Sequence, residues 1–266
     1  MATSTKAIKA AAKDIIKKNA FETLIAGIIF LFTFLICYYT ASVFLYMDSV
    51  LLSSLIFYLM LFFIIAPTFL GLVRFYWRTL FGVCDNPIAV FYYFSDKSEY
   101  LKCIKLFFTV IVRALPVCFA LYLPYLLVWL LTQNFTYDIL NITMPLWTAS
   151  LSNVAIILHI IADITIKLYF LKYYIAPTLF VANEEMSIKE ILNMSRILSY
   201  KSAVDFIFLI ISFVLWIVLS IFILPLVFTL PYMLLAFNAH IRSAIGEYNE
   251  HINTLNATKG FYEAVG

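Results

Sequence analysis

The stretch that decides the fold is residues 23–73, which read TLIAGIIFLFTFLICYYTASVFLYMDSVLLSSLIFYLMLFFIIAPTFLGLV. Asp48 is the only charged residue in this stretch. Because the hydrocarbon core of a bilayer is about 30 Å thick and is crossed by about 20 helical residues, the stretch is too long for a single crossing. It therefore predicts two transmembrane helices that are separated at Asp48 and Ser49.

The rest of the chain has the same apolar character. It is 64% apolar and only 12% charged over 266 residues, whereas average soluble domains are about 45–50% apolar and about 25% charged. A water-soluble fold of this composition would expose far more apolar surface than soluble monomers tolerate. The composition predicts an all-α fold, a polytopic membrane bundle of about six transmembrane helices with additional interfacial amphipathic helices. The predicted spans are 23–46, 50–73, 106–131, 150–172, 204–222 and 225–243.

The charges predict the orientation, because cytoplasmic loops of membrane proteins carry an excess of Lys and Arg. Every Lys and Arg outside the predicted spans lies in the N-terminal segment, in residues 74–105, in residues 173–203 or after residue 243. Lys172 and Arg242 lie at the cytoplasmic ends of their predicted spans. The opposite connections contain Asp48 and Asp138 but neither Lys nor Arg. We therefore expect a plasma membrane protein with both termini cytoplasmic.

This arrangement predicts a single integral membrane domain over residues 1–266. It consists of an amphipathic N-terminal helix (1–21), a six-span bundle (22–244) and a cytoplasmic tail (245–266). The Lys-rich start followed by an apolar run has the polarity of a secretory signal, but the run is longer than such a signal needs. We interpret it as an uncleaved first span.

Two cytoplasmic segments are amphipathic, and we expect both to contact anionic lipid on the inner leaflet. In the first segment, residues 6–18, we expect Ile8, Ile15 and Ile16 to face acyl chains. In the second, residues 187–200, Ser187 and Glu190 form a capping box, and the apolar side is expected to rest on the leaflet as an elbow before the fifth span. The predicted lipid-contacting residues are Lys6, Lys9, Lys13, Lys17, Lys189 and Arg196.

One tetrapeptide occurs twice. Residues 65–68 read Ile-Ala-Pro-Thr, and residues 175–178 repeat them. Each copy lies at the predicted cytoplasmic end of an inward-running span. The shared position favours a tandem repeat. Helix ends with Pro are common, however, so a chance identity is about equally plausible.

The C-terminal half resembles an uncharacterised bacterial family of multi-pass membrane proteins, domain of unknown function 975. The matching residues are Tyr173, Tyr174, Pro177, Ala182, Asn183, Ser195, Lys201, Asp205, Ser212, Phe213, Trp216, Leu219, Pro231 and Tyr232. The chain departs from the family at residues 183–185, where the family has Asp-Asn-Pro, and at Tyr200 and Leu215, where it has Gly. The resemblance implies a multi-pass membrane protein and no particular activity.

Ionisable residues inside a span are costly and are therefore candidates for function. His159, Asp163 and Lys167 follow one another at four-residue spacing on one face of the fourth predicted span, and Arg113 lies at a similar depth in the third. One interpretation is an Arg113–Asp163 ion pair that serves as a gate or coupling site. In the alternative interpretation, which we favour, Asp163 pairs with Lys167 in its own helix, and Arg113 only holds two helices together.

Motifs for catalysis, cofactors or metals are missing from the sequence. It contains no phosphate loop, no H-E-x-x-H and no G-x-S-x-G, and its four Cys lack metal-site spacing. Nucleic-acid binding has no support either. We expect a non-enzymatic membrane protein without cofactor or metal that binds membrane lipids or a protein partner. The first alternative is a small transporter or channel-like protein built around Arg113, His159 and Asp163, and the second is a membrane-embedded lipid enzyme.

Overall fold

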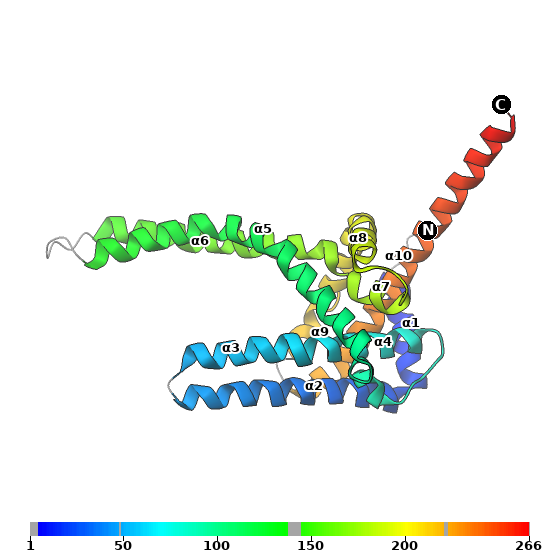
Figure 1. Ribbon diagram of the computed structural model, residues 1–266, viewed down its shortest axis with the longest axis horizontal. Helices are drawn as coiled ribbons and strands as arrows, with labels where there is room; N and C mark the ends of the chain where they lie inside the picture. Colours follow the sequence, from blue (N-terminus) through cyan, green and yellow to red (C-terminus); the bar gives the residue numbers. More distant parts are fainter. Residues whose placement is uncertain (1–4, 48, 138–144, 221–222, 266) are drawn as a thin grey trace. The chain divides into compact units, whose positions relative to one another are not determined.

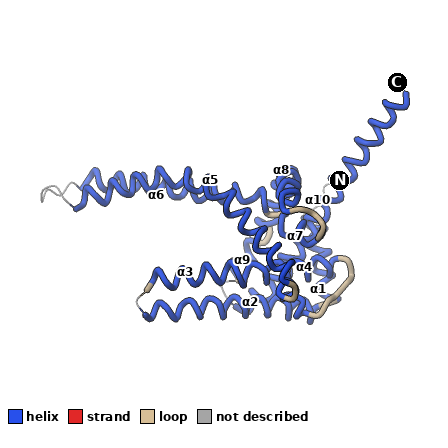
Figure 2. Tube along the Cα trace, viewed as in Figure 1, coloured by secondary structure: helices blue, strands red, loops and turns tan. Residues whose placement is uncertain are grey.

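A computed structural model describes residues 5–47, 49–137, 145–220 and 223–265. These residues are almost entirely helical and include no strand (Figures 1 and 2), so the predicted all-α fold is confirmed. Asp48 and Asp138, which mark two predicted outer connections, lie outside the described residues.

Four helical segments of the described chain are long and apolar enough to cross a membrane, as the first four predicted spans require. They are Ala20–Val43, Val50–Leu80, Lys97–Leu130 and Asn153–Ala182. The fifth predicted span corresponds to the second half of α8 (Ile188–Ile211) together with α9 (Val214–Leu219), and the sixth lies within α10 (Ile223–Val265). The total of about six spans stays a prediction.

Contacts along the chain divide it into two compact units. The core unit comprises residues 1–107 and 173–266, and the hairpin unit comprises residues 108–172. The hairpin unit contains most of α5 (Lys97–Tyr137) and α6 (Pro145–Phe170). In the predicted C-terminal tail, residues 245–266, α10 continues as far as Val265.

The core unit begins with α1 (Thr5–Lys18) and a pair of long antiparallel helices (Figure 1). The pair consists of α2 (Ala20–Val43) and α3 (Val50–Met60), joined through the short 3-10 helix η1 (Phe44–Met47). The buried Ser53 hydroxyl donates to the Ala41 carbonyl at 2.9 Å and so links α2 to α3. Small residues allow such close approach of helices in lipid, and Ala41 and Cys37 are buried in α2.

Pro67 explains a local change of helix type. The segment η2 (Leu61–Ile65) is a π-helical turn that leads directly into α4 (Ala66–Leu80). A proline has no N–H, so it leaves the carbonyl four residues earlier without its usual donor. That carbonyl belongs to Phe63, and it accepts a hydrogen bond from the Tyr100 hydroxyl at 3.0 Å.

Helix α4 is largely buried within the core unit. Its Leu70, Leu72, Phe75 and Tyr76 are inaccessible, and the 3-10 helix η3 (Pro87–Phe94) packs directly against it. Gly71 makes this packing possible, because a Cβ at this position would lie 1.9 Å from the Val90 carbonyl oxygen.

Both copies of the Ile-Ala-Pro-Thr sequence begin a buried helix. The first begins α4 at Ala66, and the second begins α7 (Ala176–Ala182) after the short 3-10 helix η4 (Leu171–Tyr173). Thr68 and Thr178 are both buried, and the two helices contact each other. The equivalent structural positions support the tandem repeat, which stays a hypothesis.

Candidate functional site

The predicted intramembrane site lies entirely within the hairpin unit, on α5 and α6. Asp163 pairs with Lys167 one turn later in α6, and both side chains are substantially exposed. His159 is also exposed, and its ring lies 5.7 Å from the Tyr122 ring and 5.0 Å from the Tyr125 ring on α5. The structure therefore forms the Asp163–Lys167 pair that the favoured interpretation requires.

The predicted Arg113–Asp163 ion pair is not formed in the described part of the hairpin unit, because the carboxylate takes Lys167 on its own helix. Arg113 is half-buried, and its backbone carbonyl accepts a hydrogen bond from the Tyr169 hydroxyl at 3.0 Å. Pro116 interrupts the hydrogen-bond ladder of α5 in this turn. Arg113 thus connects α5 to α6 through its backbone rather than its charge.

One side of helix α1 carries exposed lysines, which we call the lysine face. Lys6, Lys13 and Lys17 are exposed, and their spacing places them within a narrow arc of the helix. The opposite side contains Ile8 and Ala12, which are buried in the hydrophobic core with α4 and α10. The prediction that the isoleucines face acyl chains is therefore wrong for Ile8.

Ile15 and Ile16 also pack, partly buried, against that core. An amphipathic helix can bury its apolar side against either protein or lipid, and here α10 and α2 supply the protein surface.

Lys9 differs from the other α1 lysines. Its ammonium donates to the Ser212 carbonyl at 2.7 Å and lies 4.2 Å from the centre of the Phe213 ring. Partial burial lowers the pKa of Lys9. Lys9 therefore binds the break between α8 and α9 instead of facing lipid as predicted.

The capping box at the start of α8 is confirmed. The Ser187 backbone donates to the Glu190 carboxylate at 2.9 Å, and the Glu190 backbone donates to the Ser187 hydroxyl at 3.3 Å. These hydrogen bonds lower the pKa of the Glu190 carboxyl.

The prediction that residues 187–200 form an elbow on the leaflet is wrong, because α8 continues without a break from Ile188 to Ile211. Ile191, Leu192 and Leu198 are buried within the core unit, where α7 and α10 cover this side of the helix. Lys189 and Arg196 are exposed on the other side, as the lipid-contact prediction requires.

Sequence reasoning missed a buried polar cluster that joins three parts of the core unit. The Tyr174 hydroxyl lies 2.7 Å from the Ser202 hydroxyl and 3.3 Å from His240 Nε2. Its ring stacks on Phe206 at 3.8 Å between centroids. Tyr174 fits a membrane-interface aromatic by sequence, and only the fold brings it to residues far along the chain.

A second buried cluster consists of uncharged groups. Thr178 donates from its hydroxyl to the Asn238 side-chain oxygen at 3.0 Å, and the Asn238 amide nitrogen donates to the Val73 carbonyl at 3.3 Å. Asn238 therefore joins α7 to α4 from its place on α10. In lipid, such contacts between helices replace the hydrophobic driving force that water provides.

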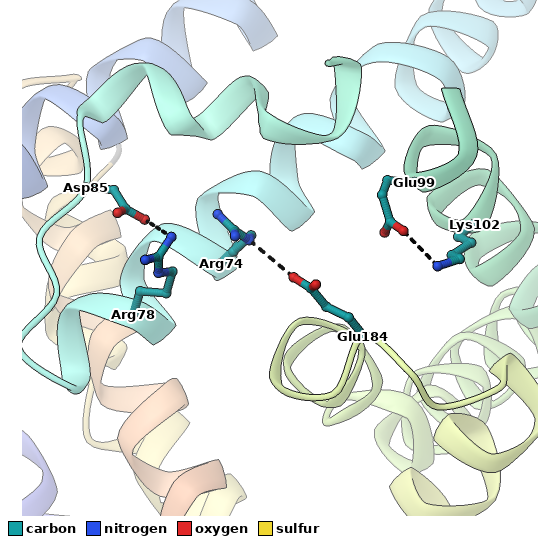
Figure 3. A network of polar contacts seen from close by, with 6 residues as sticks. All are labelled: Arg74, Arg78, Asp85, Glu99, Lys102 and Glu184. Atoms are coloured by element: carbon teal, nitrogen blue, oxygen red, sulfur yellow. Dashed lines mark hydrogen bonds and ion pairs between the residues drawn. The ribbon is translucent and has the colours of Figure 1, made fainter. Parts of the chain in front are cut away.

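Figure 3 shows charged groups that attach loops to α4. Arg74 lies 3.8 Å from Glu184, and Arg78 pairs with Asp85 at 2.8 Å. The Arg74 guanidinium also lies 3.6 Å from the centre of the Tyr92 ring. Tyr92 belongs to η3, while Glu184 follows α7. The two arginines thus hold both segments onto one helix, which is a structural role.

The described residues contain no cluster of three or more His, Cys, Asp or Glu side chains arranged to bind a metal ion. No family model, curated protein or solved structure matches the chain. The resemblance of the C-terminal half to an uncharacterised bacterial family stays a prediction, and the functional argument rests on the geometry of the core unit.

Proposed function

We propose that this chain is a non-enzymatic plasma membrane protein that binds anionic lipids of the cytoplasmic leaflet through the lysine face of α1. The observation that carries the proposal is the separation of the two sides of α1. Lys6, Lys13 and Lys17 are exposed, whereas Ile8 and Ala12 opposite them are buried in the protein.

This separation gives the lysines a fixed position. A free amphipathic helix must insert its apolar side into lipid to bind, but α1 is already attached to the core unit through that side. Its lysines therefore project from the protein surface. Each basic residue near an anionic leaflet contributes about 1 kcal/mol, and salt screens the attraction.

Lys189 and Arg196 extend the basic character to the start of α8, where both side chains are exposed. All of these residues lie in segments that the distribution of Lys and Arg assigns to the cytoplasmic side. The transport alternative has less support, because it was based on an Arg113–Asp163 pair and Asp163 pairs with Lys167 instead.

The proposal is tested with the full chain reconstituted in bilayers that contain spin-labelled phosphatidylglycerol or spin-labelled phosphatidylcholine. Electron paramagnetic resonance measures the fraction of each lipid that the protein restricts. We expect severalfold selectivity for phosphatidylglycerol, weakened by salt and largely abolished when Lys6, Lys13 and Lys17 are all replaced by Gln.

Replacement of the same three lysines by Arg is the matched control, because it keeps the charge and should keep the selectivity. Equal restriction of the two lipids by the parent protein would contradict the proposal. Full selectivity in the Gln variant would assign the lipid binding to other residues and would also contradict it.

A further inference from the structure

A cleft of about 190 Å³ lies between α8 and α10 in the core unit. Helix α8 contributes Lys201, Ser202 and Asp205, which share one side of the helix, and α10 contributes His240 and Glu247. A cavity needs about 10–15 Å³ to hold one water molecule, so the cleft has room for several. The cleft is therefore large enough for a small polar group and too small for a whole lipid.

The inner end of the cleft is rigid. Ser202 and His240 are each more than nine-tenths buried, and both contact the Tyr174 hydroxyl. The Ser202 hydroxyl also donates to the Leu198 carbonyl at 2.8 Å. Because these contacts fix the two side chains in place, the cleft presents a preformed polar surface rather than a gap between mobile residues.

The outer part of the cleft contains charges of both signs. Lys201 and Asp205 are one turn apart on α8, yet among the described residues Asp205 forms no ion pair. The Lys201 ammonium lies instead 5.6 Å from the centre of the Tyr248 ring. Glu247 adds a second carboxylate, which accepts a hydrogen bond from Ser243 at 3.5 Å. An ammonium and separate carboxylates around one cavity are complementary to a ligand that carries both an anionic group and an amine.

An exposed apolar strip begins beside the cleft. Val204, Phe208 and Ile211 on α8 are 63%, 60% and 57% exposed. They follow Lys201 at intervals of three, four and three residues, so they form one row along the helix. In a membrane, such a row is covered by acyl chains. A phospholipid could thus place its headgroup in the cleft and its chains along the row.

We propose that the cleft between α8 and α10 binds the headgroup of a phospholipid that carries a primary amine. Lys201 faces the phosphate, and Asp205 and Glu247 accept hydrogen bonds from the ammonium. A choline headgroup has the same charges but no N–H donors and a larger cationic end, so it fills this cavity less well. The site is separate from the lysine face of α1.

The test uses the purified full chain and native mass spectrometry with an equimolar mixture of phosphatidylethanolamine, phosphatidylcholine and phosphatidylglycerol that share the same acyl chains. We expect one phosphatidylethanolamine to be retained with about tenfold higher occupancy than phosphatidylcholine. Asp205→Asn should bring this ratio close to one. Lys201→Gln should reduce the retention of both lipids, because both contain the phosphate.

Asp14→Asn is the matched control, since Asp14 is exposed on α1 and does not line the cleft, and it should leave the ratio unchanged. The Gln variant of Lys6, Lys13 and Lys17 should also leave the ratio unchanged, so failure of this proposal and failure of the proposed function are distinguishable. Equal retention of the two zwitterionic lipids by the parent would overturn the inference. Displacement of the bound lipid by equimolar soluble glycerophosphoethanolamine would overturn it too, because the site would then bind the free headgroup.

Discussion

The core unit and the hairpin unit are both built from apolar helices, yet they differ in where their polar side chains lie. In the core unit, Asn238, Thr178 and Tyr76 are buried and hydrogen-bonded across helices. In the hairpin unit, Asp163 and Lys167 are exposed and pair within a single helix.

This difference in burial indicates which polar groups stabilise the fold. A buried uncharged group stabilises the fold when its partner lies on another helix, and it costs free energy when that partner is lost. An exposed ion pair within one helix contributes little. We therefore expect the core unit to be sensitive to substitutions that leave the charge unchanged, and the hairpin unit to tolerate loss of its charges.

The largest expected effect comes from Gly71→Ala in the core unit. The added Cβ would lie 1.9 Å from the Val90 backbone oxygen, so α4 and η3 would have to separate. Overpacking costs about 1–3 kcal/mol and occasionally more, and a backbone clash places this variant at the upper end. Thermal unfolding in detergent should show a markedly lower midpoint.

The control for this prediction is Gly246→Ala, because among the described residues no atom beyond the adjoining α10 backbone lies within 4 Å of the added Cβ. Alanine favours a helix by roughly 0.5–1 kcal/mol over glycine, so this variant should be neutral or slightly stabilised. Equal stability of the two variants would show that α4 and η3 are not closely packed.

A smaller loss of stability is expected for Asn238→Leu. The change removes both hydrogen bonds of the side chain and leaves the Val73 carbonyl without this donor. Buried polar groups left unpaired cost about 1–3 kcal/mol, and we expect about 2 kcal/mol here by chemical or thermal unfolding. Asn193→Leu on the exposed side of α8 is the matched control. A loss of the same size in both variants would contradict the role of Asn238.

Tyr76→Phe isolates one hydrogen bond between helices. The Tyr76 hydroxyl is buried and donates to the Thr23 carbonyl of α2 at 2.8 Å. Loss of this bond should cost about 1 kcal/mol, measured as a shift of the unfolding midpoint. Tyr200→Phe should leave stability unchanged, since Tyr200 is 90% exposed. An unchanged unfolding midpoint in Tyr76→Phe would show that this hydrogen bond does not stabilise the core unit.

The smallest effect is expected in the hairpin unit, for Lys167→Gln. The Asp163–Lys167 pair is exposed, and such pairs at four-residue spacing contribute about 0.3–0.5 kcal/mol. A double-mutant cycle with Asp163→Asn, followed by unfolding, measures the coupling between the two residues. A coupling above about 2 kcal/mol would show that the hairpin unit depends on charge pairing as strongly as the core unit depends on Asn238.

Local features were predictable from the sequence. The four long apolar helices follow from the length of the apolar stretches, and the capping box follows from Ser187 and Glu190 at the required spacing. The exposure of Lys6, Lys13 and Lys17 follows from the periodicity of α1, whereas Lys9, predicted for the same face, packs on Ser212 and Phe213. The Asp163–Lys167 pair also lies within one helix turn, so spacing alone was enough to propose it. Each of these features depends on residues that are close in the chain.

The sequence by itself therefore determined the helical class, the positions of the apolar helices and the contacts within single helices. The tertiary structure decided which apolar side packs on protein and which side remains exposed. Hydropathy does not separate these environments, because Ile and Leu are equally suitable for lipid and for a protein interior. For this reason Ile8 was assigned to lipid, although it is buried in the core unit. The cluster of Tyr174, Ser202 and His240 also required the fold, because residues from three separate segments must come together to form the inner end of the cleft.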